Sequence, residues 1–390
     1  MILTKKIRLK PTHEQELLFY RMAGAARWAY NLALSEDRRV YDNWVATGKP
    51  EDRVYFNESL IRKHIVQLKK MPEFSWLKEI SSQTVAEAVR EFDKVRKTFL
   101  KNREPGQHLS FKSKRKTRPS FYTPARTIRQ VQNAIILEKI GSVKAKGTIP
   151  DGKLMDPRIF YDGKYWYLTV SHEVEERTEK LTNVTLGIDL GIKELAVCSD
   201  GKVYRNINKT ATVKKIKKKL KREQRRFSRK LEANVQSRTA NGRLIYHRPL
   251  DDCKNFFKNK RKLKLLYRRL TNIRQNHLHQ VTAEIAKTKP SRVVLEDLNI
   301  SSMMRNRHLS KAIAEQKWYE FRRLLEYKCK RIGIQVVLAD KFFASSKTCS
   351  HCGHVKRDLK LSDRTYRCLE CGLIIDRDLN AAINLSQYQC

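Results

Sequence analysis

Val-Thr-Leu-Gly-Ile-Asp-Leu-Gly-Ile-Lys, residues 184–193, is the stretch on which the fold of this chain depends. Its near-continuous apolar run predicts a buried strand. The apolar residues of the run are Val184, Leu186, Ile188 and Leu190. Asp189 lies inside it, where a carboxylate is costly to bury unless a cation compensates its charge. A hard divalent ion such as Mg²⁺ would do so, and the flanking Gly187 and Gly191 leave room for a ligand or backbone. The alternative is a strand-end Asp that caps a turn.

The chain is strongly basic. It has 390 residues, with 83 Lys and Arg against 41 Asp and Glu, and a formal net charge of +42. A charge of this size points to a polyanionic partner, and nucleic acid is the obvious candidate. A membrane surface is disfavoured, because the basic residues are spread over the whole chain and the sequence has no long apolar span. A chain of this length has room for two or three domains.

The N-terminus and the cysteines indicate a reducing compartment. Met1–Lys10 has lysines but no sustained apolar core, so it does not resemble a signal peptide. We therefore expect a cytoplasmic protein, bacterial or archaeal and nucleoid-associated, whose eight cysteines are reduced or bound to metal. Four single cysteines are expected to carry no chemistry. They are Cys198, Cys253, Cys329 and Cys390.

The other four cysteines form two Cys-x-x-Cys pairs with fifteen residues between the pairs. This is the spacing of a zinc ribbon, in which two knuckles place four thiolates around one Zn²⁺. The predicted zinc ligands are Cys349, Cys352, Cys368 and Cys371. Because protein fills all four positions, the ion would be structural.

Two further stretches place carboxylates where Asp189 could meet them. A predicted buried strand over residues 292–297 ends in the acids Glu296 and Asp297, and Asp376 and Asp378 lie at the start of a predicted helix. Taken singly, Asp376 or Asp378 is an N-cap candidate. Taken with Asp189 and Glu296, a third carboxylate at the same metals is the better interpretation. Two Mg²⁺ ions held by such carboxylates would support phosphodiester cleavage.

The first half of the chain predicts a strand, then helices, then strands. Residues 2–9 alternate apolar and basic residues, which suits an edge strand. Thr12 and Gln15 form a capping-box pattern that starts a helix. Two more helices are expected over 57–70 and 82–101.

A hairpin is expected around Asp162-Gly163, which separates two aromatic-rich runs. The aromatic side chains of these runs, residues 159–161 and 165–170, have two interpretations. They could stack bases in an oligonucleotide-binding barrel. They could equally be cross-strand core pairs, which we favour.

The second half has the order of an α/β nuclease fold. The central strand opens a three-stranded antiparallel meander up to residue 207, which begins a mixed sheet. Two long basic helices follow, separated by a polar loop over 237–252. A strand, a helix and a strand are then expected at 292–297, 311–331 and 334–339. Carboxylates at strand ends in this order suggest an α/β sheet nuclease.

Basic side chains concentrate in one loop and in the two long helices. The tract 111–118 predicts a loop that orders against phosphate, and each long helix has one apolar seam with Lys and Arg elsewhere. We therefore expect these residues to contact nucleic-acid backbone. The predicted contacts are Lys112, Lys114, Arg115, Lys116, Lys214, Lys218, Arg222, Arg225, Arg226 and Arg268.

Four motifs together make the chain resemble TnpB, the transposon-encoded RNA-guided nuclease family related to type V CRISPR effectors. They are Gly-Ile-Asp-Leu-Gly-Ile-Lys (187–193), Val-Leu-Glu-Asp-Leu-Asn (294–299), Phe-Phe-Ala-Ser-Ser-Lys-Thr-Cys-Ser-His-Cys-Gly (342–353) and Asp-Arg-Asp-Leu-Asn-Ala-Ala-Ile-Asn (376–384). The likeness runs over most of the chain and is densest from Leu186 to Leu385. It implies a RuvC-type catalytic triad of Asp189, Glu296 and Asp378, with Asp297 and Asp376 as the second choices for the last two.

The resemblance also implies an architecture, which is α/β with all-β and helical parts. A RuvC/RNase H-like mixed-sheet nuclease domain would span 181–345 and 372–390, with a zinc ribbon inserted at 346–371. An oligonucleotide-binding-like wedge β-barrel would span 1–10 and 112–180, with a helical recognition region inserted at 11–111.

The function that the residues predict is a metal-dependent nuclease. The resemblance adds a guide RNA from the transposon end and a double-stranded DNA target beside a short motif that the protein reads, with base pairing reading the rest. Two alternatives remain open, a DNA strand-transferring transposase with the same carboxylates and a non-catalytic nucleic-acid-binding regulator. The acids and cysteines are all intact, which argues against the family's nuclease-dead relatives.

Overall fold

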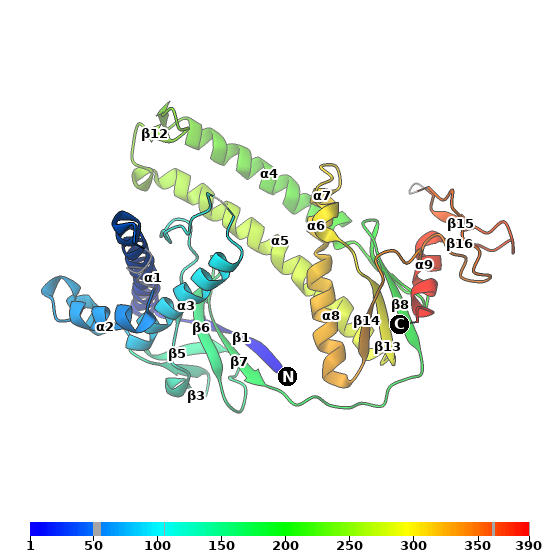
Figure 1. Cartoon of the computed structure of the whole chain (residues 1–390), viewed down its shortest axis with the longest axis horizontal. Coiled ribbons are helices and arrows are strands. Elements are labelled where there is room, and N and C mark those ends of the chain that lie inside the picture. Colours follow the sequence, from blue (N-terminus) through cyan, green and yellow to red (C-terminus); the bar gives the residue numbers. More distant parts are fainter. Residues whose placement is uncertain (50–55, 105, 361–362, 390) are drawn as a thin grey trace. The chain divides into compact units, whose positions relative to one another are not determined.

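The computed structural model describes residues 1–49, 56–104, 106–360 and 363–389, which fall into two compact units, Met1–Val174 and Glu175–Cys390 (Figure 1). Cys390, one of the predicted single cysteines, lies outside the described residues. Among the helices of the described ranges, none is both long and apolar enough to cross a membrane. The content is mixed α and β, as the sequence predicts.

The first unit contains a curled seven-stranded sheet in the order β2-β6-β7-β1-β5-β4-β3. Its strands are β1 (Ile2–Lys10), β2 (Ser120–Tyr122), β3 (Arg129–Val131), β4 (Ala134–Leu137), β5 (Gly141–Lys146), β6 (Met155–Tyr161) and β7 (Trp166–Glu173). The prediction of an edge strand at residues 2–9 is wrong, because β1 pairs with β7 on one side and β5 on the other. Two of its basic side chains, Lys6 and Arg8, are covered by aromatic rings. Lys6 Nζ lies 3.8 Å from the ring of Tyr167, and the Arg8 guanidinium lies 3.4 Å from the ring of Tyr165.

The predicted hairpin is confirmed, with β6 and β7 joined by the turn at Asp162. Asp162 accepts hydrogen bonds from the backbone N–H groups of Lys164 and Tyr165, at 3.0 and 2.9 Å. Phe160 and Tyr167 are register partners and stack with ring centroids 5.6 Å apart. Cross-strand pairing is therefore confirmed, but this pair is outside the core, because Phe160 and Tyr167 are only partly buried whereas their neighbours Ile159 and Leu168 are fully buried.

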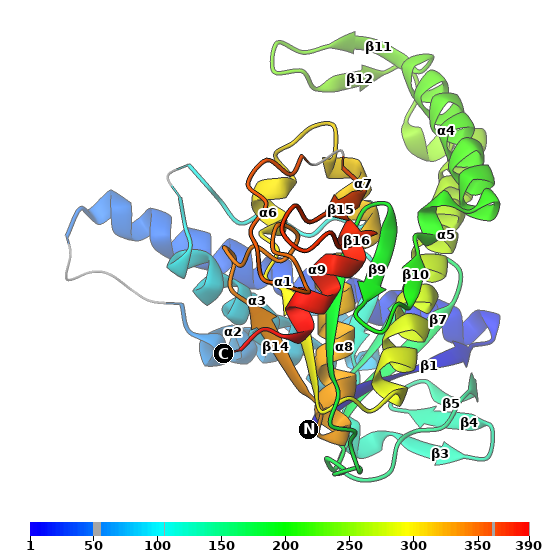
Figure 2. The ribbon, with the colours of Figure 1, turned by 90° about the vertical axis from the view of Figure 1, so that its right-hand side faces the viewer.

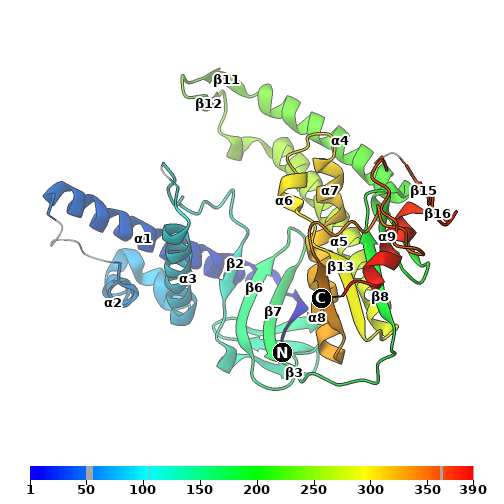
Figure 3. The ribbon, with the colours of Figure 1, turned by 45° about the vertical axis from the view of Figure 1, so that its right-hand side comes forward.

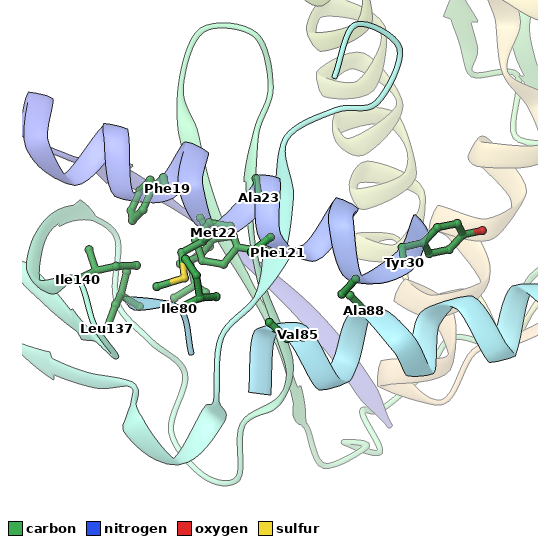
Figure 4. Close-up of a cluster of buried hydrophobic side chains, with 14 of the residues drawn as sticks. Phe19, Met22, Ala23, Tyr30, Ile80, Val85, Ala88, Phe121, Leu137 and Ile140 are labelled. Carbon is green, nitrogen blue, oxygen red and sulfur yellow. The ribbon is translucent and has the colours of Figure 1, made fainter. Parts of the chain in front are cut away.

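The helices of the first unit are α1 (His13–Thr47), α2 (Glu58–Leu68) and α3 (Ser82–Lys101), with 3₁₀ helices η2 (Pro72–Glu79) and η3 (Ala125–Thr127). Thr12 and Gln15 form the predicted capping box at the start of α1. Figure 4 shows how α1 packs its apolar face against the sheet and α3. The buried side chains at this junction include Phe19, Met22, Val85, Phe121 and Leu137.

The second unit is built on a five-stranded mixed sheet in the order β10-β9-β8-β13-β14. Its strands are β8 (Thr185–Leu190), β9 (Glu194–Cys198), β10 (Val203–Arg205), β13 (Arg292–Glu296) and β14 (Gln335–Ala339). β8, β9 and β10 form the predicted antiparallel meander, and β8, β13 and β14 run parallel. The meander and the mixed sheet are thus confirmed.

Alternation along β8 and β13 sends their side chains to two different layers. Leu186, Ile188 and Leu295 pack with helices α5 (Lys254–Lys287) and α8 (Trp318–Ile332). Val294 packs on the opposite face with Leu385 of helix α9 (Arg377–Ser386). Figure 3 shows β13 beside α8, and α9 near β8 on the other side.

The two long basic helices, α4 (Ala211–Glu232) and α5, pair as an antiparallel hairpin (Figure 2). Their seam is apolar, as the sequence predicts, and consists of Val213, Ile216, Leu220, Leu263, Leu266 and Leu270. The prediction of a polar loop at 237–252 is wrong in part. Strands β11 (Val235–Arg238) and β12 (Leu244–Tyr246) pair there, because Thr239 and Arg243 close a turn between them through a backbone hydrogen bond. The 3₁₀ helices η4 (Ile207–Lys209) and η5 (Leu250–Asp252) precede α4 and α5.

The helix predicted over 311–331 is interrupted. It consists of α7 (Ser310–Gln316) and α8, separated by Lys317 in the left-handed conformation, φ 56° and ψ 46°. Gln316 is buried and donates to the backbone carbonyl of Gly191 at 2.8 Å, while Trp318 is buried in the core. A straight helix would not direct both side chains to these places, so the backbone turns between them. A short helix, α6 (Ile300–Met303), precedes α7.

The remaining strands, β15 (Thr365–Arg367) and β16 (Ile374–Asp376), form a small antiparallel pair directly before α9. Helix α9 crosses β8 at Gly187. A Cβ atom on Gly187 would lie 2.0 Å from the carbonyl oxygen of Ala382 and 2.4 Å from the nitrogen of Ser386. Only glycine permits this approach of helix to strand.

We expect Gly187→Ala to destabilise the second unit by about 3 kcal/mol, because α9 must move off the sheet to accommodate the methyl group. Chemical denaturation of the purified chain measures the change. Gly24→Ala in α1 is the control, since its Cβ would meet only the end of the Arg27 side chain at 3.8 Å. A Gly187→Ala variant as stable as the parent would contradict the close packing.

Candidate active site

The structure brings the three predicted carboxylates together at one end of the five-stranded sheet. Asp189 lies on β8 and Glu296 at the end of β13, and the register Ile188↔Leu295 makes them neighbours on adjacent parallel strands. Both lie on the sheet face that α9 covers, because each is two residues after a position in contact with α9, Gly187 and Val294. Asp378 is in the first turn of α9. Three segments far apart in the sequence thus converge on one place.

Electrostatics at this place are unfavourable without a cation. Burial, followed by the charges of Glu296 and Asp378, raises the pKa of Asp189 well above its usual range. Burial also raises the pKa of Glu296, against the opposing effect of its hydrogen bond from Ser345, and Asp378 raises it further. A cluster in which carboxylates resist ionisation gains most from a bound divalent ion, so the donor set fits Mg²⁺.

Asp376 and Asp378 have different roles in the structure. Asp376 is the N-cap of α9, and its Oδ1 accepts from the backbone N–H groups of Asp378 and Leu379 at 2.9 and 3.2 Å. Asp378 is largely buried beside Arg377, with its Oδ1 3.3 Å from the guanidinium. Of the two carboxylates, Asp378 raises the pKa of Asp189 more strongly than Asp376 does.

Glu296 and Asp297 also separate. Ser345 Oγ donates a hydrogen bond to Glu296 Oε1. Asp297 instead pairs with Arg322, at 3.3 Å, and lies 3.8 Å from Lys341 Nζ. Asp297 is thus compensated by side chains, whereas Glu296 faces the other acids.

A hollow of about 360 Å³ opens beside Glu296. Its walls include the apolar Leu298, Ile300 and Trp318 and the basic Arg322 and Lys341. Tyr319 at its rim is 70% exposed. An apolar wall next to cations suits a nucleotide, whose base is apolar on its faces and whose phosphate is anionic.

The four predicted zinc ligands also converge. The sulfur atoms of Cys349, Cys352, Cys368 and Cys371 all lie within 4.8 Å of one another. Cys349 Sγ is 3.6 Å from Cys371 Sγ, and Cys352 Sγ is 3.5 Å from Cys368 Sγ. Tetrahedral Zn–S bonds of about 2.3 Å place sulfur atoms at about 3.8 Å, so the quartet fits a zinc ion.

The pKa values of the thiols in the quartet move in opposite directions. The backbone N–H of Cys371 is the main influence that lowers the pKa of Cys368 to about 6. The backbone contact with His354 acts to lower the pKa of Cys352 as well, but desolvation by the surrounding atoms and the neighbouring sulfurs raise it to about 12. Four thiols crowded this closely ionise together only around a cation.

The described single cysteines differ from the quartet. Burial raises the pKa of Cys198 and of Cys329 to about 12, which suits inert core thiols. Cys253 is partly buried, and its Sγ lies 3.6 Å from the carbonyl oxygen of Pro249.

The predicted nucleic-acid contacts lie in different settings. In α4 the side chains of Lys214, Lys218, Arg222 and Arg225 are exposed. Arg226 is exposed too but pairs with the buried Glu223 at 3.1 Å. In the loop, Lys114, Arg115 and Lys116 are exposed.

Two of the predicted contacts are partly buried. Lys112 pairs with Glu91 at 2.7 Å and lies over the ring of Tyr30, so it serves the first unit's own packing. Arg268 in α5 is also partly buried.

Three buried polar residues beside the acids and the quartet were not predicted from the sequence. They are Ser345, Asn380 and Asn384. The signal for the asparagines was present, since polar residues at i and i+4 among alanines predict a buried hydrogen-bonding face on α9. Nothing in a single sequence indicates that Ser345 reaches Glu296, 49 residues away.

Three family models match the chain. One described as "Probable transposase" matches residues 167–307, one described as "Cas12f1-like, TNB domain" matches 318–385, and one described as "Helix-turn-helix domain" matches 1–43. Together they match well over half of the chain. The chain belongs to the TnpB family. Residues 1–43 of this TnpB-family protein form β1 and most of one continuous helix, α1, so the third description does not fit their structure.

Relatives match this TnpB-family protein over nearly its full length. The Escherichia coli (strain K12) protein named "Putative RNA-guided DNA endonuclease InsQ" is 28% identical, over 97% of this chain and 90% of that protein. A Streptomyces pristinaespiralis protein named "Putative RNA-guided DNA endonuclease" is 27% identical, over 97% of this chain and 87% of that protein.

The fold also resembles a solved structure. The match is to Cas12f1 in a complex with single guide RNA and target DNA, with a TM-score of 0.59 and 14% identity, over 99% of this chain and 98% of that one. At this identity the likeness concerns the fold alone.

Substitution of two of the acids should change stability in opposite directions. In Mg²⁺-free buffer at pH 7, Asp189→Asn should raise the melting temperature, because a carboxyl whose pKa is raised on folding is destabilising when ionised. Asp376→Ala should lower it, since removal of an N-cap costs about 1 kcal/mol. Thermal unfolding monitored by circular dichroism measures both. A lower melting temperature for Asp189→Asn would contradict the repulsion among the acids.

Proposed function

We propose that this protein is a transposon-encoded, RNA-guided DNA endonuclease that cuts target DNA by metal-dependent phosphodiester hydrolysis. The observation that carries the proposal is the convergence of Asp189, Glu296 and Asp378 on one face of the sheet. Membership of the TnpB family and the names of the full-length relatives support the same activity.

In this proposal Asp189, Glu296 and Asp378 are the ligands of two Mg²⁺ ions. When bound, such a pair of ions activates a water molecule and stabilises the leaving oxygen of the cut phosphodiester. Among the described residues, the cysteine quartet is the one set of three or more His, Cys, Asp or Glu side chains whose ligand atoms all lie within 4.8 Å of one another. The three carboxylates do not form a set of that kind, and the proposal divides them between two ions.

The other parts have separate tasks. Zn²⁺ in the cysteine quartet would hold the ribbon together. A guide RNA from the transposon end would pair with the target strand, while basic residues hold the backbones and the protein reads a short motif beside the target. Our proposed division of the chain into domains is the one that the resemblance implies. It has a wedge at 1–10 and 112–180, a recognition region at 11–111, a nuclease domain at 181–345 and 372–390 and a ribbon at 346–371. The cytoplasmic location stays a prediction.

We expect Asp189→Ala to lower the rate of cleavage by several orders of magnitude, while guide-dependent binding of target DNA is retained. The matched control is Asp200→Asn, a turn residue of the same sheet whose carboxylate accepts from the backbone N–H of Lys202. Cleavage of a labelled target duplex by the protein with its co-purified RNA measures the first effect, and gel-shift titration measures the second. Persistent Mg²⁺-dependent cleavage by Asp189→Ala would disprove the assignment of the acids.

The exposed face of α4 gives a second test, on the nucleic-acid interface. Replacing Lys218, Arg222 and Arg225 by Ala should weaken RNA binding and flatten its salt dependence, by about 1 in the log–log slope for each phosphate that is no longer neutralised. The matched control keeps the charge with Lys218→Arg, Arg222→Lys and Arg225→Lys. Binding titrations over a series of salt concentrations measure the slope, and an unchanged slope in the triple Ala variant would remove α4 from the interface.

A strand-transferring transposase is the second candidate, because one matching family model carries the description "Probable transposase". The same three carboxylates could serve it. Incubation with DNA of the transposon ends distinguishes the two functions, since only a transposase yields joined products. For a non-catalytic regulator, the third alternative, a double-alanine variant of the acids would leave the cellular phenotype unchanged.

A further inference from the structure

Three buried polar side chains lie between the cysteine quartet and the acids. Ser345, Asn380 and Asn384 are 3%, 0% and 4% exposed. Ser345 is in the segment that leads from β14 to Cys349, and the two asparagines are one turn apart on α9. Buried polar groups are costly unless hydrogen-bonded, so their partners indicate what they hold in place.

The two asparagines hold the segment that contains the first zinc ligand. Asn384 Nδ2 donates to the backbone carbonyls of Ser345 and Thr348, both at 2.7 Å. Asn380 Nδ2 donates to the same Thr348 carbonyl at 2.7 Å, and its Oδ1 accepts from the N–H of Ser350 at 3.0 Å. Residues 345–350 are thus fixed to α9 on both sides of Cys349.

The same segment holds a member of the acid cluster. Ser345 Oγ donates a hydrogen bond to Glu296 Oε1, and the second carboxylate oxygen of Glu296 takes no part in this bond. A carboxylate whose one oxygen is fixed presents the other in a defined direction, and such outer hydrogen bonds orient ligands at metal sites.

The ribbon also fixes the third acid. β16 runs directly into α9, and Arg377 N–H donates to the carbonyl of Arg364 at 2.9 Å, next to β15. Asp378 follows at once. The fold of the ribbon therefore sets where α9 begins, and with it the place of Asp378.

We propose that Ser345, Asn380 and Asn384 are positioning residues through which the four-cysteine ribbon sets the geometry of Glu296 and Asp378. The inference rests on the proposed metal-binding role of the acids. According to this inference, the Zn²⁺ ion of the ribbon is needed for tight binding of divalent ions at the acid centre, which is the cluster of Asp189, Glu296 and Asp378. This requirement is in addition to the role of Zn²⁺ in the ribbon's own fold.

Titration of Mn²⁺ into the full-length protein, followed by electron paramagnetic resonance, tests the proposal without measuring cleavage. Asp189→Ala gives the background of binding elsewhere. We expect Ser345→Ala to weaken Mn²⁺ binding at the acid centre about 10- to 100-fold, with zinc content and melting temperature close to those of the parent. Ser345→Thr, which keeps a hydroxyl, should recover part of the affinity.

Ser350→Ala is the matched control. Ser350 lies in the same segment, and its contact with Asn380 uses the backbone N–H, which the substitution retains. It should bind Mn²⁺ like the parent. If Ser345→Ala does not fold, Ser345→Cys replaces it, because a thiol of similar shape donates only weakly.

A second experiment combines zinc removal with Ser345→Ala, and tests whether the zinc ion and Ser345 affect Mn²⁺ binding through the same contacts. Removal of zinc from the parent by a thiol-reactive reagent and a chelator, followed by exchange into chelator-free buffer, should weaken Mn²⁺ binding. In Ser345→Ala the same removal should have a clearly smaller effect, since part of the path is already broken. Additive effects, or unchanged Mn²⁺ affinity in Ser345→Ala, would overturn the inference. Equal Mn²⁺ binding by the parent and Asp189→Ala would instead overturn the proposed function on which it rests.

Discussion

The close contact of α9 with the backbone of β8 at Gly187 is the constraint on which the acid centre depends. Gly187 has no Cβ, and a methyl group there would overlap the backbone of α9. The contact lets the first turn of α9 bring Asp378 to the sheet face that carries Asp189 and Glu296. With a side chain at position 187, the helix would stand away from the sheet and the third carboxylate would leave the cluster.

This packing places like charges together, which folding alone would avoid. The raised pKa of Asp189 records the cost, and the other features of the site limit it. Asp376 is used as a helix cap, Asp297 is paired with Arg322, and Ser345 holds one oxygen of Glu296. The two neighbouring acids thus have structural partners, and the remaining unfavourable charge is concentrated on the three acids where a divalent ion would bind. Stability is given up locally at the place where chemistry is proposed.

Sequence patterns predicted the structure best where a pattern has a local cause. The capping box at Thr12, the hairpin at Asp162, the meander after β8 and the seam of α4 and α5 follow from spacing and turn chemistry, and the structure has them. Predictions from the sequence were wrong where contacts with residues distant in the chain determine the structure. β1 is central because β5 and β7 flank it, and the helix near Lys317 breaks because Gln316 reaches the backbone carbonyl of Gly191. The strand pair β11 and β12 also escaped prediction, since runs of four and three residues are too short to indicate strands.

The sequence by itself determined which chemical groups the protein has and in what local settings. Two Cys-x-x-Cys pairs, an acid inside an apolar strand and a net charge of +42 are properties of the chain, and they suffice for the expectation of a zinc ribbon, a metal-binding acid and a polyanionic partner. Only the tertiary structure decided which acids lie together and which acid caps helix α9. It also decided that Ser345 and two asparagines connect the ribbon with the acids. The physical reason is that hydrogen bonds and charge repulsion act over a few ångströms, and folding brings within that range residues that are 30 or more positions apart in the chain.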